Sequence, residues 1–149
     1  MDMMRYVALC AVVVAALVGG TPMAAQAQDT DPDELFVVVS TDDAQTQMMA
    51  MVLATQSLRQ GASVRVLLCG AGGRLALQNT ESPAFQPIDR TPKQLMQNLL
   101  RQDVPVDVCA IFLPNTDAEA SDLIEGIGIA RPPAIAEYMM KPGVRYFTF

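Results

Sequence analysis

The stretch LFVVVSTDD, residues 35–43, joins a continuous apolar run to a sequence that can begin a helix. An apolar run of this length, rich in valine, is typical of a strand that is covered on both faces. The residues that follow can cap a helix, because the carboxylates of Asp42 and Asp43 favour the positive end of its dipole. The stretch therefore predicts the first strand-to-helix step of an α/β domain.

The same alternation continues through the rest of the chain. Further strands are predicted over residues 64–69, 104–113 and 144–149, and helices over 44–60, from a capping box at 91–94, over 114–125 and over 132–140. Because helices separate successive strands, the strands must run parallel and be joined by right-handed crossovers. We therefore expect a three-layer α/β fold, Rossmann-like or flavodoxin-like, with a parallel sheet of about four to five strands and helices on both faces.

Composition limits the possible functions. The chain has 149 residues, which fits about one domain. It carries 10 Lys and Arg against 16 Asp and Glu, and this net charge of −6 argues against nucleic acid as a partner. It has no His, which excludes triads and zinc sites built on imidazole. Hydrophobic residues make up 51% of the chain, a share that excludes intrinsic disorder.

The N-terminal segment has the pattern of an export signal. Arg5 precedes an unbroken apolar run over residues 6–18, and Ala25 and Ala27 place small residues where a signal peptidase cleaves. The run is shorter than the ~20 residues that cross a bilayer, and a retained membrane anchor is the alternative. We expect residues 1–27 to be a cleaved signal peptide, residues 28–34 a flexible arm, and residues 35–149 a single periplasmic domain with no stable membrane anchor.

Candidate binding residues gather at one predicted edge of the sheet. In parallel sheets, ligands bind beyond the carboxyl ends of the strands, where residues 40–43, 69–73 and 109–116 should meet. The glycine run 70–73 is either a tight turn that needs positive φ or a backbone nest for a small sulfur or phosphorus oxyanion. It is no dinucleotide fingerprint, because Leu75 stands at the last glycine position. The binding candidates are Ser40, Thr41, Cys69, Gly70, Gly72, Gly73 and Asn115.

Cys109 is the candidate for covalent chemistry. It stands late in a predicted strand, at the ligand-binding edge, before the helix predicted over residues 114–125. The dipole of that helix would stabilise a thiolate. The alternative is a cysteine that packs as a small, unreactive apolar side chain.

No cofactor or metal is expected. Methionine thioethers can bind Cu(I), but the methionines beyond the leader mostly stand at apolar helical spacing, where methionine fills gaps in a core. These methionines are Met48, Met49, Met51, Met96, Met139 and Met140.

Beyond the leader, the cysteines of the chain are Cys69 and Cys109, and in an oxidising compartment they could form a disulfide. A flavodoxin-like order, with the first strand between the second and third, would separate them by ~10 Å, beyond the ~7 Å that a disulfide spans. On this order the sequence favours two free thiols.

The stretch VDVCAIF, residues 106–112, resembles the third-strand segment of the DsrE/DsrF-like sulfur-relay proteins, a family that includes TusD- and YchN-like members. Residues 36–40, 61–69 and 126–149 resemble flanking units of that family in the same order. The resemblance implies a Rossmann-like subunit that assembles into homotrimers or homohexamers. It also implies that Cys109 accepts sulfur as a persulfide and exchanges it with donor and acceptor proteins. Two features depart from the family. One is the export signal; the other is the stretch LPNT at residues 113–116, which stands where basic residues follow the cysteine in the sulfur-relay members.

Three functions are consistent with the sequence. The first is a sulfur carrier or sulfurtransferase acting through Cys109. The second is a periplasmic module that binds a small anion or a partner, with Cys109 only packed. The third is a structural exported protein with Cys69 joined to Cys109.

Overall fold

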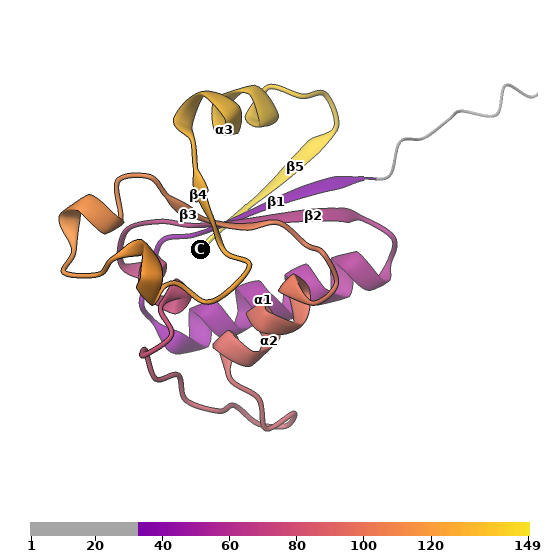
Figure 1. The fold of residues 1–149 in the computed structure, drawn as a ribbon. Coiled ribbons are helices and arrows are strands. Elements are labelled where there is room, and N and C mark those ends of the chain that lie inside the picture. The colour runs from indigo at the N-terminus through magenta and orange to yellow at the C-terminus, as the bar shows by residue number, and fades with distance from the viewer. Residues whose placement is uncertain (1–32) are drawn as a thin grey trace, which may run out of the picture.

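A five-stranded parallel sheet organises residues 33–149, the part of the chain that the computed structural model describes (Figure 1). The predicted α/β fold class is confirmed. The expected leader, residues 1–27, and most of the expected arm lie outside the described residues. The strands are β1 (Glu34–Val39), β2 (Ser63–Leu68), β3 (Val106–Cys109), β4 (Gly128–Ala130) and β5 (Val144–Thr148), in the order β4-β3-β2-β1-β5.

Helices cover both faces of the sheet unequally. Helices α1 (Ala44–Arg59) and α2 (Pro92–Leu100) pack side by side on one face, and α3 (Pro132–Met139) lies alone over the other (Figure 1). The predicted caps are confirmed: the Asp43 carboxylate accepts from the Thr46 N–H at 2.8 Å, and Thr91 opens a capping box. No helix within residues 33–149 is long and apolar enough to cross a membrane.

The strand order differs from the flavodoxin-like order that the sequence argument used. Strand β2 lies between β1 and β3, so the expectation that the first strand separates the second from the third is wrong. The physical reason is that α1 and α2 cross on the same face, which carries the chain steadily in one direction from β1 to β4. The α3 crossover then returns the chain over the opposite face to the free edge of β1.

The segment after β3 also differs from its prediction. The predicted strand over residues 104–113 is only four residues long, and the helix predicted over 114–125 does not form. Two short 3-10 helices, η2 (Leu113–Asn115) and η3 (Ala120–Asp122), stand there instead. The polar stretch offers no apolar stripe that could dock a longer helix on the sheet. Strand β4, which sequence reasoning missed, follows this segment.

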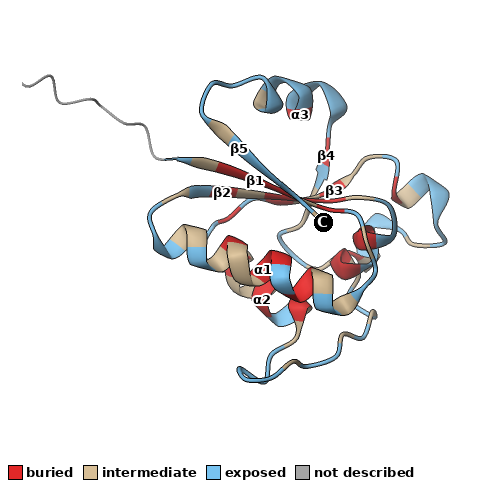
Figure 2. Cartoon of the chain, turned by 180° about the vertical axis from the view of Figure 1, so that it is seen from behind, coloured by how far each residue is buried: buried red, intermediate tan, exposed pale blue. Residues whose placement is uncertain are grey.

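The main core lies between the sheet and the pair α1 and α2, where the buried residues concentrate (Figure 2). Alternate residues of β1, β2 and β3 enter it, as period-two strands require. Met48, Met51 and Met96 are buried there, in agreement with the packing interpretation. Met49, Met139 and Met140 are exposed.

A 3-10 helix, η1 (Gly70–Ala76), packs closely beneath the end of β1. A Cβ at Gly72 would lie 2.4 Å from the Val39 carbonyl oxygen, and one at Gly73 would lie 2.4 Å from the Phe112 ring. Gly70 adopts φ +51°, a conformation that side chains disfavour. The glycine run is thus required by a turn and by two close approaches.

A polar cluster attaches α3 to the sheet. The Arg65 guanidinium binds the Asp107 carboxylate at 2.7 Å and also lies 5.2 Å from the centre of the Tyr138 ring. Lys141 lies 5.0 Å from the same ring and 3.8 Å from the Glu34 carboxylate. Burial, with the nearby Glu34 carboxylate, raises the pKa of Tyr138 to about 12.

Replacing Gly72 by Ala should lower the free energy of unfolding by roughly 2–4 kcal/mol, because the new methyl group meets a main-chain oxygen that cannot move without disturbing β1. Urea unfolding measures the change. The control is Ala71→Ser, an exposed position in the same 3-10 helix, which should stay within ~0.5 kcal/mol of the parent. A Gly72→Ala chain as stable as the parent would contradict the close packing of η1.

The raised pKa of Tyr138 predicts a loss of stability at alkaline pH. The folded chain holds the phenol proton more tightly than the unfolded chain, so the stabilising contribution is complete below about pH 10 and is lost as pH rises towards about 12. In Tyr138→Phe this loss is absent. Urea unfolding at about pH 9 and about pH 12 should therefore show a steeper decline in the parent than in the variant. Equal declines would show that Tyr138 does not titrate differently on folding.

Candidate functional site

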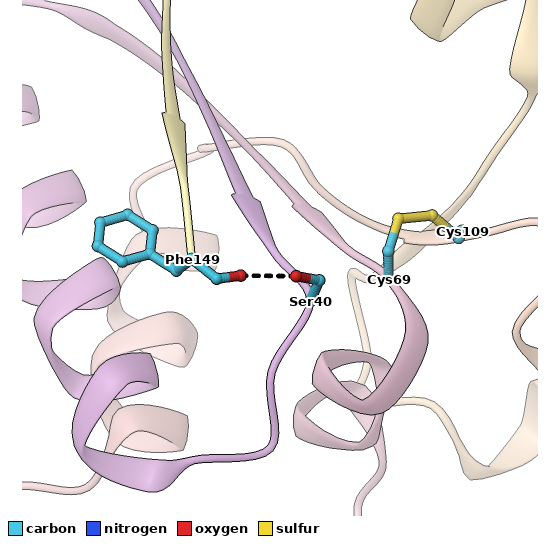
Figure 3. The surroundings of a disulfide bond; sticks show 4 residues. All are labelled: Ser40, Cys69, Cys109 and Phe149. Carbon is cyan, nitrogen blue, oxygen red and sulfur yellow. Dashed lines mark hydrogen bonds between the residues drawn. A yellow bond between two sulfur atoms is a disulfide. The ribbon is translucent and has the colours of Figure 1, made fainter.

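The candidate site is a pair of cysteines at the carboxyl ends of two neighbouring strands (Figure 3). Leu68 of β2 pairs with Val108 of β3, so the next residues, Cys69 and Cys109, face one another in register. Their Cα atoms lie 5.1 Å apart, and a disulfide joins them. The sequence argument for two free thiols was therefore wrong, because it assumed a strand between β2 and β3.

The cysteines lie on the thinly covered face of the sheet. Both are partly buried against the small cluster formed by Phe36, Leu67 and Ala130 beneath α3. The main chain around them is held firmly: the Cys69 N–H donates to the Val39 carbonyl at 2.9 Å, and the Phe112 N–H donates to the Cys109 carbonyl, also at 2.9 Å. The pair is thus fixed to the sheet but remains partly accessible to solvent.

The electrostatic argument for a Cys109 thiolate is not supported. It relied on a helix after Cys109, and the segment that follows forms only two short 3-10 helices, η2 and η3. On the same face, Arg65, four residues before Cys69, is paired with Asp107, two residues before Cys109, at 2.7 Å. The guanidinium charge is therefore largely balanced by the carboxylate and is not directed at the cysteines.

Two of the predicted binding residues serve the fold. The Ser40 N–H and hydroxyl both donate to the main-chain oxygen of Phe149, at 2.7 and 2.8 Å (Figure 3). The Thr41 hydroxyl accepts from the Asp43 N–H at 3.0 Å, and its carbonyl accepts from the buried Gln47 amide at 2.8 Å. These groups close the end of β5 against β1 and support the start of α1.

The structure also gives most of the other predicted binding residues a role in the fold. A Cβ added at Gly70 would lie 3.6 Å from the Ser40 carbonyl oxygen. The fold therefore brings Ser40, Cys69 and Gly70 together. The packing of Gly72 and Gly73 against β1 and Phe112 accounts for both glycines. Asn115 is exposed, and its side-chain amide donates to the Ile111 carbonyl at 2.7 Å.

Sequence reasoning missed a hollow that flanks η1. It encloses about 400 Å³ and includes the charged side chains of Arg74, Asp117 and Asp122. Most of its lining comes from the loop after η1 and from the irregular segment after η2, where no periodic pattern marks a position as functional. Its remaining lining residues are Leu77, Asn79, Thr80, Phe112, Thr116 and Ala118.

A larger hollow, of about 630 Å³, lies elsewhere. It is bounded by Glu34 at the start of β1, by the end of α1 and by Arg145 and Phe147 of β5. The cysteines do not line it, since they follow the opposite ends of their strands. Within residues 33–149, no three or more His, Cys, Asp or Glu side chains group as a metal site.

Comparison with known sequences identifies neither a family nor an activity for this chain. No protein-family model matches the chain. The sequence is 27% identical over 122 residues to the uncharacterised protein MJ0760 of Methanocaldococcus jannaschii. The match covers 78% of this chain and 43% of that protein, so the chain spans less than half the length of this relative.

Solved structures are more informative. The ychN protein from E. coli superposes with a TM-score of 0.67 at 17% identity, covering 80% of this chain and all of that one. MTH1491 from Methanobacterium thermoautotrophicum, a protein of unknown function, gives 0.57 at 16% identity, with the same coverage. BT1422 from Bacteroides thetaiotaomicron, also of unknown function, gives 0.55 at 20% identity, covering 78% of this chain and 95% of that one. The chain therefore has the DsrE/YchN-like α/β fold that its sequence resembles.

Proposed function

We propose that this chain is an exported sulfur carrier that accepts sulfur on Cys109 as a persulfide. The observation that carries the proposal is the position of Cys109: it ends β3 of a ychN-like fold, partly exposed, on the thinly covered face of the sheet. The main chain on both sides of it is anchored to the sheet, which fixes the direction of the Cα–Cβ bond of Cys109.

The chemistry is thiol exchange with a sulfane sulfur, meaning a sulfur bonded as the outer atom of a persulfide. The reduced Cys109 thiolate attacks that outer sulfur, and the donor thiolate leaves. Cys109 then carries one additional sulfur, and the thiolate of an acceptor protein removes it in the same way. The disulfide is the oxidised form, so the carrier works after reduction of the Cys69–Cys109 bond.

A second candidate is a non-catalytic module that binds a small anion or a partner. The disulfide favours it, because a cross-link between positions 40 residues apart stabilises a fold by roughly 4 kcal/mol without any reactivity. The hollow of about 400 Å³ beside η1, whose wall carries Arg74 together with Asp117 and Asp122, is the part of the structure that would hold the ligand or the partner's side chain. In this case Cys109 takes up no sulfur.

We also propose that the chain forms a homo-oligomer, a trimer or hexamer as in the family it resembles. Apolar side chains remain exposed on the edge strand β5 and on α1. In β5, Tyr146 is 43% and Phe147 37% exposed, and in α1, Met49 is 53% exposed. Strand β5 also leaves one edge without a neighbour in the described chain.

Sulfur uptake at Cys109 is tested in chains that carry Cys10→Ser, so that only Cys69 and Cys109 remain as thiols. Cys69→Ser is reduced, freed of reductant and incubated with glutathione persulfide. Intact mass should increase by one sulfur atom, which fragmentation places on Cys109 and a reductant removes. Cys109→Ser, with Cys69 retained, is the matched control and should gain none. No uptake in folded Cys69→Ser would favour the binding module.

The oligomer is tested by sedimentation at micromolar concentration. We expect a species with three or six times the mass of one chain, because burying the exposed aromatic residues of β5 between copies is favourable. Tyr146→Glu with Phe147→Glu should shift the population towards smaller species. A parent that sediments as a single chain would contradict the proposal.

A further inference from the structure

The two cysteines are placed so that each can react with the other without movement of the sheet. Strands β2 and β3 pair in register up to Leu68 and Val108, and the cysteines form the next row, with Cα atoms 5.1 Å apart. Main-chain hydrogen bonds of 2.9 Å hold both positions. Rotation of the side chains alone therefore brings the two sulfur atoms into contact or separates them.

The same geometry governs any group that Cys109 carries. A persulfide on Cys109 has an inner sulfur, attached to its Cβ, and an outer sulfur. The inner sulfur occupies the place of the Cys109 sulfur that the structure joins to Cys69. A reduced Cys69 thus lies within bonding reach of the inner sulfur, whereas an acceptor protein must approach the outer sulfur from solvent.

Resting on the proposed sulfur uptake at Cys109, we infer that Cys69 is a second catalytic residue, which expels the carried sulfur as hydrogen sulfide. The Cys69 thiolate attacks the inner sulfur of the Cys109 persulfide, a Cys69–Cys109 disulfide forms, and the bond between inner and outer sulfur breaks. The outer sulfur leaves with its proton as HS⁻. Two cysteine thiols are oxidised by two electrons, and the sulfane sulfur is reduced to sulfide.

The disulfide in the structure is then the product of a turnover (Figure 3). A dithiol reductant restores the two thiols by exchange and becomes a disulfide itself. The complete cycle converts a persulfide and a dithiol into a thiol, hydrogen sulfide and a disulfide. The chain is on this basis a dithiol-dependent persulfide reductase, with small-molecule or protein persulfides as its substrate class.

The experiment is a single turnover with glutathione persulfide. The Cys10→Ser chain, with Cys69 and Cys109 intact, is reduced with a dithiol, freed of it and mixed with one equivalent of the persulfide. We expect one sulfide released per chain, no lasting sulfur adduct, and a Cys69–Cys109 disulfide found by peptide mapping. Cys69→Ser should keep the sulfur on Cys109 and release sulfide at least about tenfold more slowly, because its intramolecular attacking thiolate is lost. Cys109→Ser measures the sulfide released by the reagent alone.

The outcomes separate the two proposals. If the chain with both cysteines carries a stable persulfide on Cys109 and leaves Cys69 as a free thiol, the inference is overturned and the sulfur carrier stands. If the chain with both cysteines releases no sulfide and Cys69→Ser takes up no sulfur, the carrier proposal fails and the inference with it. Peptide mapping of Cys69→Ser distinguishes a persulfide on Cys109 from a mixed disulfide with glutathione, and the mixed disulfide overturns the inference because it shows that the sulfide came from attack on the inner sulfur of the reagent. Where Cys69→Ser does not fold, Cys69→Ala takes its place.

Discussion

The main-chain hydrogen bonds that pair β2 with β3 are the constraint on which the candidate site depends. Parallel pairing sets a spacing of about 5 Å between neighbouring strands and leaves no freedom in which residues face one another. In this sheet it aligns Leu68 with Val108 and, one row further, two cysteines from segments 40 residues apart. A shift of one residue in this register would turn one cysteine to the opposite face. The site exists because the register is right.

The two faces of the sheet differ in how much apolar surface they bury. The face beneath α1 and α2 contains most of the buried apolar residues and provides most of the apolar burial that stabilises the fold. The other face has one short helix, a small apolar cluster and an ion pair between Arg65 and Asp107. The cysteines lie on this second face, so a change in their bonding leaves the main core untouched.

Local patterns in the sequence predicted local structure well. The apolar run at residues 35–39, the cap at Asp43 and the capping box at Thr91 each depend on neighbours a few positions away, and the structure has all three. The helix prediction for segment 114–125 was wrong. Its cap-like residues begin only short 3-10 helices, because no apolar stripe follows that could stabilise a longer helix against the sheet.

Long-range arrangement was harder to predict. Nothing in the sequences of β2 and α2 indicates whether α2 crosses on the same face as α1, and that choice decides whether β2 or β1 is the neighbour of β3. Cys69 and Cys109 were identified as candidates from the positions of their strand ends, but their contact depended on this order. The hollow lined by Arg74 and Asp117 comes from irregular segments, which carry no periodic signal.

The position of β1, between β2 and β5, has a consequence for how the molecule forms. Its first edge is covered by β2, close in sequence, but its second edge pairs with β5, in a register that joins Glu34 to Val144. During synthesis, that edge stays open until nearly the whole described chain has emerged. Closing so long a loop is slow, and an open apolar strand edge invites association with other chains in the meantime. Strand β5, the last strand of the described chain, thus completes the sheet at its outer edge beside β1, and folding of this domain is a late, cooperative event.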